Sequence, residues 1–280
     1  MTLRSTCAYP FSLVAAVLGA LLAAAAEAAE PPAERSAALA DAAAAATPVQ
    51  TLSCGQGNVS GALTAADPRD ASGAPFDLYS IVAGEGEVLT VSLAPQGFDG
   101  MVAIYDPDGR QVVVSAGAEA DAFAAVETDR AGTWTVAAAP RSSATGAYTM
   151  GVSCLTLPAP DFGPCVADDR TLCLAGGRFR VEAVWETSQG DSGPGHARDM
   201  TGDTGYFWFF RDSNVEVVVK ALDGCGVNGA FWVFAGGLTN VHTMLRVTDT
   251  VGDTTKTYFN PQGKAFEPIQ DTGAFATCAG

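Results

Sequence analysis

The sequence has few basic residues, two histidines and none of the short motifs that mark common catalytic sites. It holds 15 Lys plus Arg against 31 Asp plus Glu, which gives a net charge of −16. Nucleic acid is therefore an unfavourable partner, because phosphate binding needs a basic surface. The patterns HExxH, GxSxG and GxxxxGK are absent, so the usual signatures of zinc proteases, α/β-hydrolases and phosphate-binding loops are missing. We predict no catalytic residue and no enzymatic activity.

Long hydrophobic runs are also scarce, and the longest lies at the N-terminus. Arg4 supplies a positive charge, residues 11–26 are almost continuously apolar, and AEA at residues 26–28 is a small-x-small cleavage pattern. We predict that residues 1–28 are a signal peptide and that the protein is secreted or periplasmic. The run is shorter than the ~20 apolar residues of a membrane span, so no span is expected after cleavage. An uncleaved anchor is the alternative.

The segment after this signal peptide is rich in alanine and has no apolar stripe that could dock a helix. We predict that residues 29–51 form a disordered leader. Removal of residues 1–28 takes one basic and one acidic residue, so the net charge stays at −16. Such acidity favours solubility outside the cell.

Cysteine is infrequent, but its number is informative. Cys7 lies in the predicted signal peptide, and an even remainder of six in an exported chain favours disulfides. Cys54 and Cys154 stand in similar contexts, LSCG and VSCL, and we predict that they are paired. The other four are Cys165, Cys173, Cys225 and Cys278. We favour pairing the first with the second and the third with the fourth, while the other pairings stay open. Zinc is unfavourable because no CxxC pair exists and the only histidines are His196 and His242.

Residues 52–155 alternate between short apolar and polar runs separated by turn residues, which is typical of β-strands. The predicted strands are residues 88–93, 101–106, 110–115 and 133–139. The sequence DPDG predicts a hairpin turn, because Pro107 presets φ and Gly109 accepts a positive φ. Several short strands at this spacing predict a β-sandwich.

A proline-rich linker at residues 156–164 precedes a second all-β domain at residues 165–280. The predicted strands there are residues 177–186, 205–210, 215–222, 229–236, 242–249 and 256–260. In the first of these, apolar and polar side chains alternate, which predicts a half-exposed strand. We therefore expect an all-β fold made of two antiparallel β-sandwiches.

Five consecutive aromatic residues in DTGYFWFF form the strongest local signal of the chain. On a strand, Tyr206, Trp208 and Phe210 would share one face and the other two rings would share the opposite face. A second strand, at residues 229–236, repeats the arrangement. Core packing explains one ring-bearing face, but two exceed what one sandwich core requires. Core packing with cover from an edge strand or from the other domain is one explanation of the second face. The other is a ligand-binding face that contains Tyr206, Trp208, Phe210 and Trp232.

The stretch GDSGPGH at residues 190–196 is similar to the nucleophile loop of trypsin-like proteases, which would make Ser192 a nucleophile. A serine nucleophile needs a base within hydrogen-bond reach, itself oriented by a carboxylate. No histidine precedes Ser192, and His196 lies four residues beyond it in the same Gly- and Ser-rich stretch. We predict a solvated loop and retain a serine hydrolase as an alternative.

Six aspartates of the first domain are candidate calcium ligands. They are Asp67, Asp70, Asp77, Asp99, Asp106 and Asp108. Hard oxygen ligands on loops suit calcium, although the spacing does not match the EF-hand pattern. Solvated turn residues are the alternative, so calcium is left open and no other cofactor is predicted.

Two family resemblances follow from longer stretches. Three stretches of the first domain resemble the bacterial pre-peptidase C-terminal domain, with Trp134 in place of a tyrosine. They are FDLYSIVAGEGEVLTVSL, FDGMVAIYDPDGR and AGTWTVAAAPRSSATGAYTMGV. That resemblance, over residues 52–155, implies a jelly-roll-like sandwich without catalytic activity that accompanies secreted proteases and in some members binds calcium or matrix polymers. Four stretches of the second domain resemble an uncharacterised module of secreted bacterial proteins. They are LCLAGGRFRVEAVW, DTGYFWFF, VEVVVKALDG and NGAFWVFAGGLTNV. This second resemblance, over residues 165–278, implies export and modularity and supports the favoured cysteine pairing.

Taken together, these features predict an exported, non-enzymatic binding or adhesion module that acts on an extracellular polymer or protein. The alternative is an accessory or structural domain protein of a secreted peptidase system, with calcium as a ligand. A serine hydrolase that uses Ser192 is the second alternative.

Overall fold

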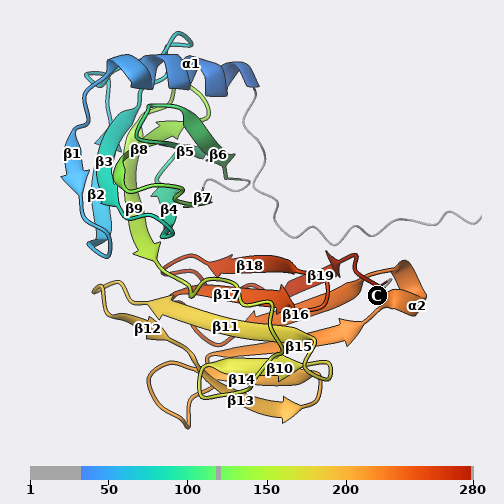
Figure 1. The fold of residues 1–280 in the computed structure, drawn as a ribbon. Helices are drawn as coiled ribbons and strands as arrows, with labels where there is room; N and C mark the ends of the chain where they lie inside the picture. Colours follow the sequence, from blue (N-terminus) through green and yellow to red (C-terminus); the bar gives the residue numbers. More distant parts are fainter. Residues whose placement is uncertain (1–32, 118–120, 279–280) are drawn as a thin grey trace, which may run out of the picture.

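The computed structural model describes residues 33–117 and 121–278, and the predicted signal peptide lies outside them. Most of the regular structure of the described chain is β-strand, arranged in four sheets (Figure 1). Neighbouring strands pair antiparallel, except that β1 runs parallel to β3. The predicted all-β fold with antiparallel sandwiches is confirmed.

The first sandwich is built from sheets 1 and 2. Sheet 1 has the strand order β1 (Gln50–Leu52), β3 (Asp77–Ala83), β8 (Gly132–Pro140), β5 (Gly100–Tyr105) and β6 (Gln111–Ala116). Sheet 2 has the order β2 (Gly57–Leu63), β9 (Gly146–Leu155), β4 (Val88–Pro95) and β7 (Ala122–Glu127). The core between them takes every second residue of each strand, as Leu89, Val91 and Leu93 of β4 show.

The predicted DPDG hairpin is confirmed. It joins β5 to β6, and Gly109 has a φ of 80°. The Gly109 N–H donates to the Asp106 carbonyl over 2.8 Å, which closes the turn.

The second sandwich is built from sheets 3 and 4. Sheet 3 has the order β10 (Thr171–Leu174), β11 (Phe179–Glu186), β17 (His242–Asp249) and β18 (Thr254–Asn260), with β12 (Ser192–Pro194) paired to β11. Sheet 4 has the order β13 (His196–Thr201), β14 (Thr204–Trp208), β15 (Val217–Asp223), β16 (Phe231–Gly237) and β19 (Ile269–Phe275). A single helical turn, α2 (Cys225–Asn228), connects β15 to β16. Phe179, Phe207, Phe231 and Phe275 lie in the core between the sheets.

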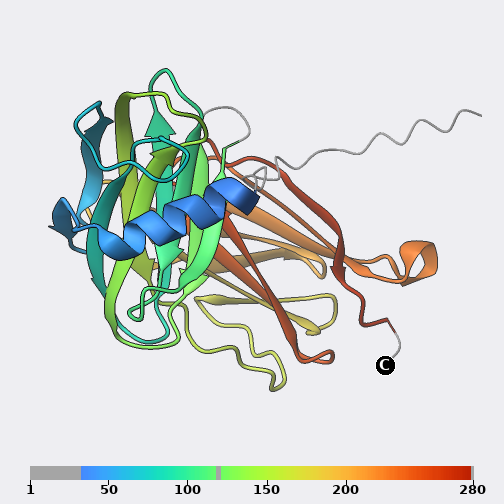
Figure 2. The same ribbon diagram turned by 90° about the horizontal axis from the view of Figure 1, so that it is seen from above.

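The predicted disordered leader is wrong from Ala33 onward, because α1 (Ala33–Ala45) and β1 are ordered there. Figure 2 shows α1 lying across the first sandwich. Leu39 is fully buried and Ala43 is buried against Phe76 and Met101 on the outer face of sheet 1. Arg35 adds an ion pair with the buried Asp70. The small alanine side chains let α1 lie close to sheet 1, so Leu39 alone reaches the apolar outer face of that sheet and no long apolar stripe is needed.

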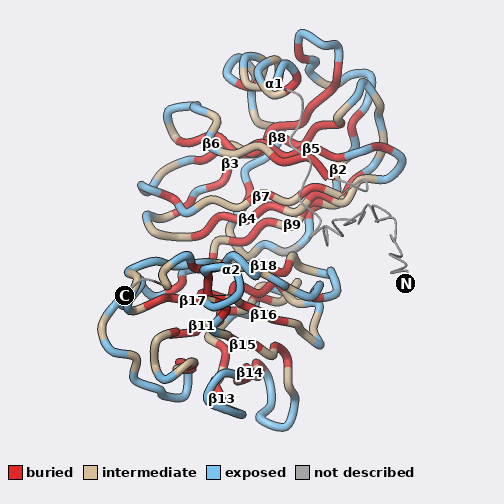
Figure 3. Tube along the Cα trace, turned by 90° about the vertical axis from the view of Figure 1, so that its right-hand side faces the viewer, coloured by how far each residue is buried: buried red, intermediate tan, exposed pale blue. Residues whose placement is uncertain are grey.

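The two sandwiches are stacked on one another (Figure 3). Val88 and Leu155 of sheet 2 pack against Val184 and Met244 of sheet 3, and Leu157 of the predicted linker joins the same cluster. This contact corrects the prediction that β11 is half-exposed. Its two faces alternate as expected, but the polar face is covered by the first sandwich, and Glu186 is only 7% exposed.

All three favoured disulfides are present. They are Cys54–Cys154, Cys165–Cys173 and Cys225–Cys278. The first ties the turn after β1 to β9, and the third ties α2 to the chain after β19. Disulfides of this kind fit an oxidising compartment. Neither helix of the described residues has the length and apolarity needed to cross a bilayer.

Replacing Leu39 with alanine tests the docking of α1. We expect the free energy of unfolding to fall by about 2–4 kcal/mol, because a fully buried leucine is lost while helix propensity improves. Urea unfolding measures this change. Asp41→Ala, at an exposed position of the same helix, is the matched control. Equal effects of the two substitutions would show that α1 is not docked.

Candidate functional site

The outer face of sheet 4 is the aromatic surface that the sequence predicts. The inward side chains of its central strands, such as Phe207, Val219 and Val233, are fully buried. The alternate residues point outward and include four half-buried rings. These are Tyr206, Trp208, Trp232 and Phe234. We call this outer surface of β13, β14, β15, β16 and β19 the ring face.

The register of the strands sets out the rings along a diagonal. Along β15, Val218 lies opposite Tyr206 of β14. Two residues further along β15, Lys220 lies opposite Phe234 of β16, and after two more residues Leu222 lies opposite Trp232. From Trp208 to Trp232 there are three steps of two residues, or about 20 Å at ~3.3 Å per residue. The ring face is therefore an elongated strip rather than a single pocket.

One end of the strip carries a polar cluster. The His196 ring stacks on Trp208, with centroids 3.9 Å apart and planes 12° apart. His196 Nδ1 lies 2.6 Å from an oxygen of Asp169, and Arg198 donates to the other oxygen over 2.9 Å. The hydrogen bonds from Arg198 and His196 hold the pKa of Asp169 below its usual range. This cluster orients Arg198 beside the rings.

The charged side chains of the ring face are basic, although the whole chain has a net charge of −16. By alternation, Arg198 of β13 and Lys220 of β15 point outward with the rings. Lys220 is exposed and forms no ion pair with another described residue. Asp169, at one end of this surface, is paired with Arg198.

The prediction that Phe210 shares the ring face is wrong. β14 ends at Trp208, so the alternation of a strand does not extend to residue 210. Phe210 instead contacts Trp185 of β11 edge-on, with centroids 4.8 Å apart. It remains 49% exposed at the border between the two sheets.

Ser192 and His196 do not form a nucleophile and base pair among the described residues. It belongs to β12 in sheet 3, opposite Glu186, whereas His196 belongs to sheet 4. No hydrogen bond among the described residues joins Ser192 to either histidine. The predicted solvated loop is partly wrong, because β12 is a paired strand. Gly190 of the same motif has a φ of 89°, and a Cβ there would lie 2.5 Å from the Gly55 carbonyl oxygen. Gly190 therefore lets this turn approach the first sandwich closely, because a side chain at this position would clash with Gly55.

The six candidate calcium ligands are not brought together. Asp70 pairs with Arg35. Asp77 accepts a hydrogen bond of 2.6 Å from the Tyr148 hydroxyl, and burial raises its pKa. Asp67 accepts from the Thr64 N–H, and Asp99 is exposed at the start of β5. No cluster of acidic oxygens with calcium spacing occurs among these aspartates.

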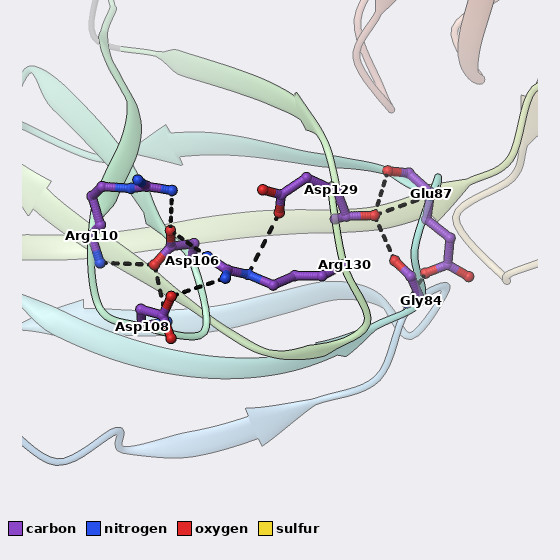
Figure 4. A network of polar contacts seen from close by, with 8 residues as sticks. Gly84, Glu87, Asp106, Asp108, Arg110, Asp129 and Arg130 are labelled. Carbon is purple, nitrogen blue, oxygen red and sulfur yellow. Dashed lines mark hydrogen bonds and ion pairs between the residues drawn. The ribbon is translucent and has the colours of Figure 1, made fainter.

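Asp106 and Asp108 belong to an arginine network at the β5–β6 turn, shown in Figure 4. Arg130 lies 2.9 Å from both carboxylates, and Arg110 also pairs with Asp106. Burial would raise the pKa of Asp106, but hydrogen bonds from the Arg110 and Asp108 amides and from the Arg110 guanidinium lower it overall. These aspartates hold the turn and its neighbouring loop together.

The contact between the sandwiches contains a polar site that sequence reasoning missed. His242 is 2% exposed, its Nδ1 lies 2.9 Å from the Asn260 carbonyl, and its Nε2 lies 3.3 Å from the Thr90 hydroxyl of the first sandwich. Glu186 lies directly opposite His242 in the β11–β17 ladder. The sequence places both on strands, but their pairing and their burial depend on the other sandwich.

No family model and no curated protein matches the chain. The pre-peptidase C-terminal domain of a Bacillus anthracis collagenase covers 39% of this chain and 98% of its own, at 11% identity and a TM-score of 0.32. It is the type of domain that residues 52–155 resemble in sequence. A Bacillus licheniformis lipase in its propeptide form covers 77% of this chain, at 12% identity and a TM-score of 0.27. A glycoside hydrolase family 32 structure from Bifidobacterium adolescentis covers 71%, at 12% identity and a TM-score of 0.24. This chain spans 43% and 40% of those two enzymes, and likenesses of this size assign no activity.

We expect calcium to leave the unfolding temperature unchanged, because Asp70, Asp77 and Asp106 already bind donors of the protein itself. Scanning calorimetry of the oxidised protein, with calcium and then with a chelator, measures this. A ligand that binds the native state raises its stability. A calcium-dependent rise in unfolding temperature would therefore restore the calcium hypothesis.

Replacing His242 with asparagine should reduce the loss of stability in acid. Burial lowers the pKa of His242 to about 4, from an ordinary value of 6.5. Between these values the unfolded chain binds more protons than the folded chain, so this contribution is complete above about pH 6.5 and is lost as the pH falls toward 4. Glu186 opposes the effect, since burial raises its pKa.

The quantity to measure is the difference in unfolding free energy between wild type and His242→Asn from pH 7 to pH 4. We expect this difference to shrink on acidification. His196→Asn, at the more exposed histidine, is the control. A difference that stays constant with pH would show that His242 is not buried in its neutral form.

Proposed function

We propose that the protein is an exported, non-enzymatic binding module that holds an extracellular polymer chain on the ring face. The observation that carries this proposal is the order of the layers. Helix α1 covers sheet 1, and sheets 2 and 3 cover each other. Within the described residues, the outer face of sheet 4 has no covering layer, yet it carries four large rings. Half-buried rings on a face without a covering layer favour a binding surface.

The shape of the ring face favours an extended glycan chain as the ligand. A strip of about 20 Å matches a linear polymer better than a small molecule, which needs a concave site. Sugar rings have apolar faces and hydroxyl edges. The rings of the strip supply apolar contact area, while Tyr206, Arg198 and Lys220 bring polar groups to the same surface.

The position of Ser192 supports a binding role over a serine-hydrolase site at the GDSGPGH motif. Asp169 and His196 form the carboxylate and imidazole half of such a site, but Ser192 lies on the other sheet. An accessory domain of a secreted peptidase system is the alternative. Copurification with an exported hydrolase, without affinity for any polymer, would favour it.

Replacing Trp232 or Tyr206 with alanine should weaken polymer binding by about 2 kcal/mol or more, as expected for central aromatic contacts. Binding is measured on a glycan array and by pull-down with insoluble polysaccharides. Phe162→Ala removes an aromatic ring that is 40% exposed in the linker, away from the ring face, and serves as the matched control.

Circular dichroism and unfolding temperatures of each variant separate binding from folding. The proposal fails if wild-type protein binds no polymer. It also fails if Trp232→Ala and Phe162→Ala bind equally well.

A further inference from the structure

The contact between the sandwiches forms a small, partly open cavity beside a wider cleft. The cavity has a volume of about 20 Å³ and is lined by Thr90, Ser153, Glu186 and His242, among others. The cleft has a volume of about 390 Å³ and shares Phe123 and Gln262 with the cavity. A cavity of this size holds one water-sized group.

Glu186 has no counter-charge in this cavity. Its side chain is almost fully buried, and no ion pair to its carboxylate occurs among the described residues. Burial raises the pKa of Glu186, and a hydrogen bond from the Ser153 side chain opposes this effect but brings no positive charge. His242 lies opposite, and its two nitrogens already face Asn260 and Thr90. A buried carboxylate without a counter-charge is costly, so natural proteins pair such groups.

Ser153 provides a second oxygen on the same cavity. It is 6% exposed, and its hydroxyl donates to Glu186, so its lone pairs remain free to accept a hydrogen bond. Ser153 comes from β9 of the first sandwich and Glu186 from β11 of the second, so both sandwiches contribute an acceptor. Thr187 and Ser188 add further oxygens to the lining.

We propose that this cavity binds a primary ammonium group, with the rest of the ligand in the cleft beside Phe123. An ammonium is close to a water molecule in size, carries one positive charge and has three donors. It therefore matches one carboxylate and neighbouring hydroxyl oxygens. A guanidinium is too large for the cavity, and a calcium ion needs six to eight oxygen ligands. The net charge of −16 also attracts cations.

The source of the ammonium is a small amine or a lysine side chain of a peptide. Isothermal titration calorimetry with butylamine and with Nα-acetyl-lysine methylamide covers both sources. We expect saturable binding of at least one probe and no binding of the lysine probe whose ε-amine is acetylated. Tighter binding of the lysine probe identifies a peptide ligand, and equal binding identifies a small amine.

Glu186→Gln should weaken binding by at least about tenfold, because the charge-assisted contact is lost. Glu182→Gln is the matched control, since Glu182 lies on the same face of β11 but outside the lining of the cavity and the cleft. Ser153→Ala should weaken binding to a smaller extent.

The proposal is overturned if neither probe binds, which would leave an ordered water as the occupant. It is also overturned if the acetylated probe binds equally, or if Glu186→Gln and Glu182→Gln behave alike. Unfolding temperatures confirm that the variants are folded. The result is independent of the ring face, because Trp232 and Tyr206 lie on the outermost sheet.

Discussion

β4 and β9 of the first sandwich pack on β11 and β17 of the second, and this contact determines which surfaces remain free. Each sandwich core buries only one face of each of its sheets. The other faces need a cover or a polar surface. Here α1 covers sheet 1 and the stacked sandwiches cover sheets 2 and 3. The ring face of sheet 4 is the face that the described layers leave open.

The same contact buries polar groups that a free sheet would expose to water. Val88 and Met244 supply the apolar part of the interface, while Glu186 and His242 supply a polar part beside it. Burial disfavours the charged form of both groups, which raises the pKa of the carboxyl and lowers that of the imidazole. We therefore expect the stability of the junction between the sandwiches to depend on pH.

The distribution of charge separates the two proposed sites by chemistry. The ring face combines rings with Arg198 and Lys220, whereas the cavity between the sandwiches presents a carboxylate and hydroxyl oxygens. Elsewhere the aspartates are held by partners of the protein, as Asp106 is by Arg110 and Arg130. Much of the acidity therefore supports turns and loops and does not form a ligand site.

The sequence by itself determined the features that depend on local periodicity and spacing. Strands β4, β5, β6, β8, β11 and β14 to β18, the DPDG turn and the shared face of Tyr206 and Trp208 were predicted, because they follow from neighbouring residues. The disulfide pairs were favoured from the contexts of the cysteines and a family resemblance, and they join residues as far as 100 positions apart. Tertiary structure decided the rest. Docking of α1 depends on a sheet face that is distant in sequence, and the place of Phe210 depends on where β14 ends. Glu186 and Ser153 meet because two sandwiches pack together, and no local pattern encodes a contact between faces of separate sheets.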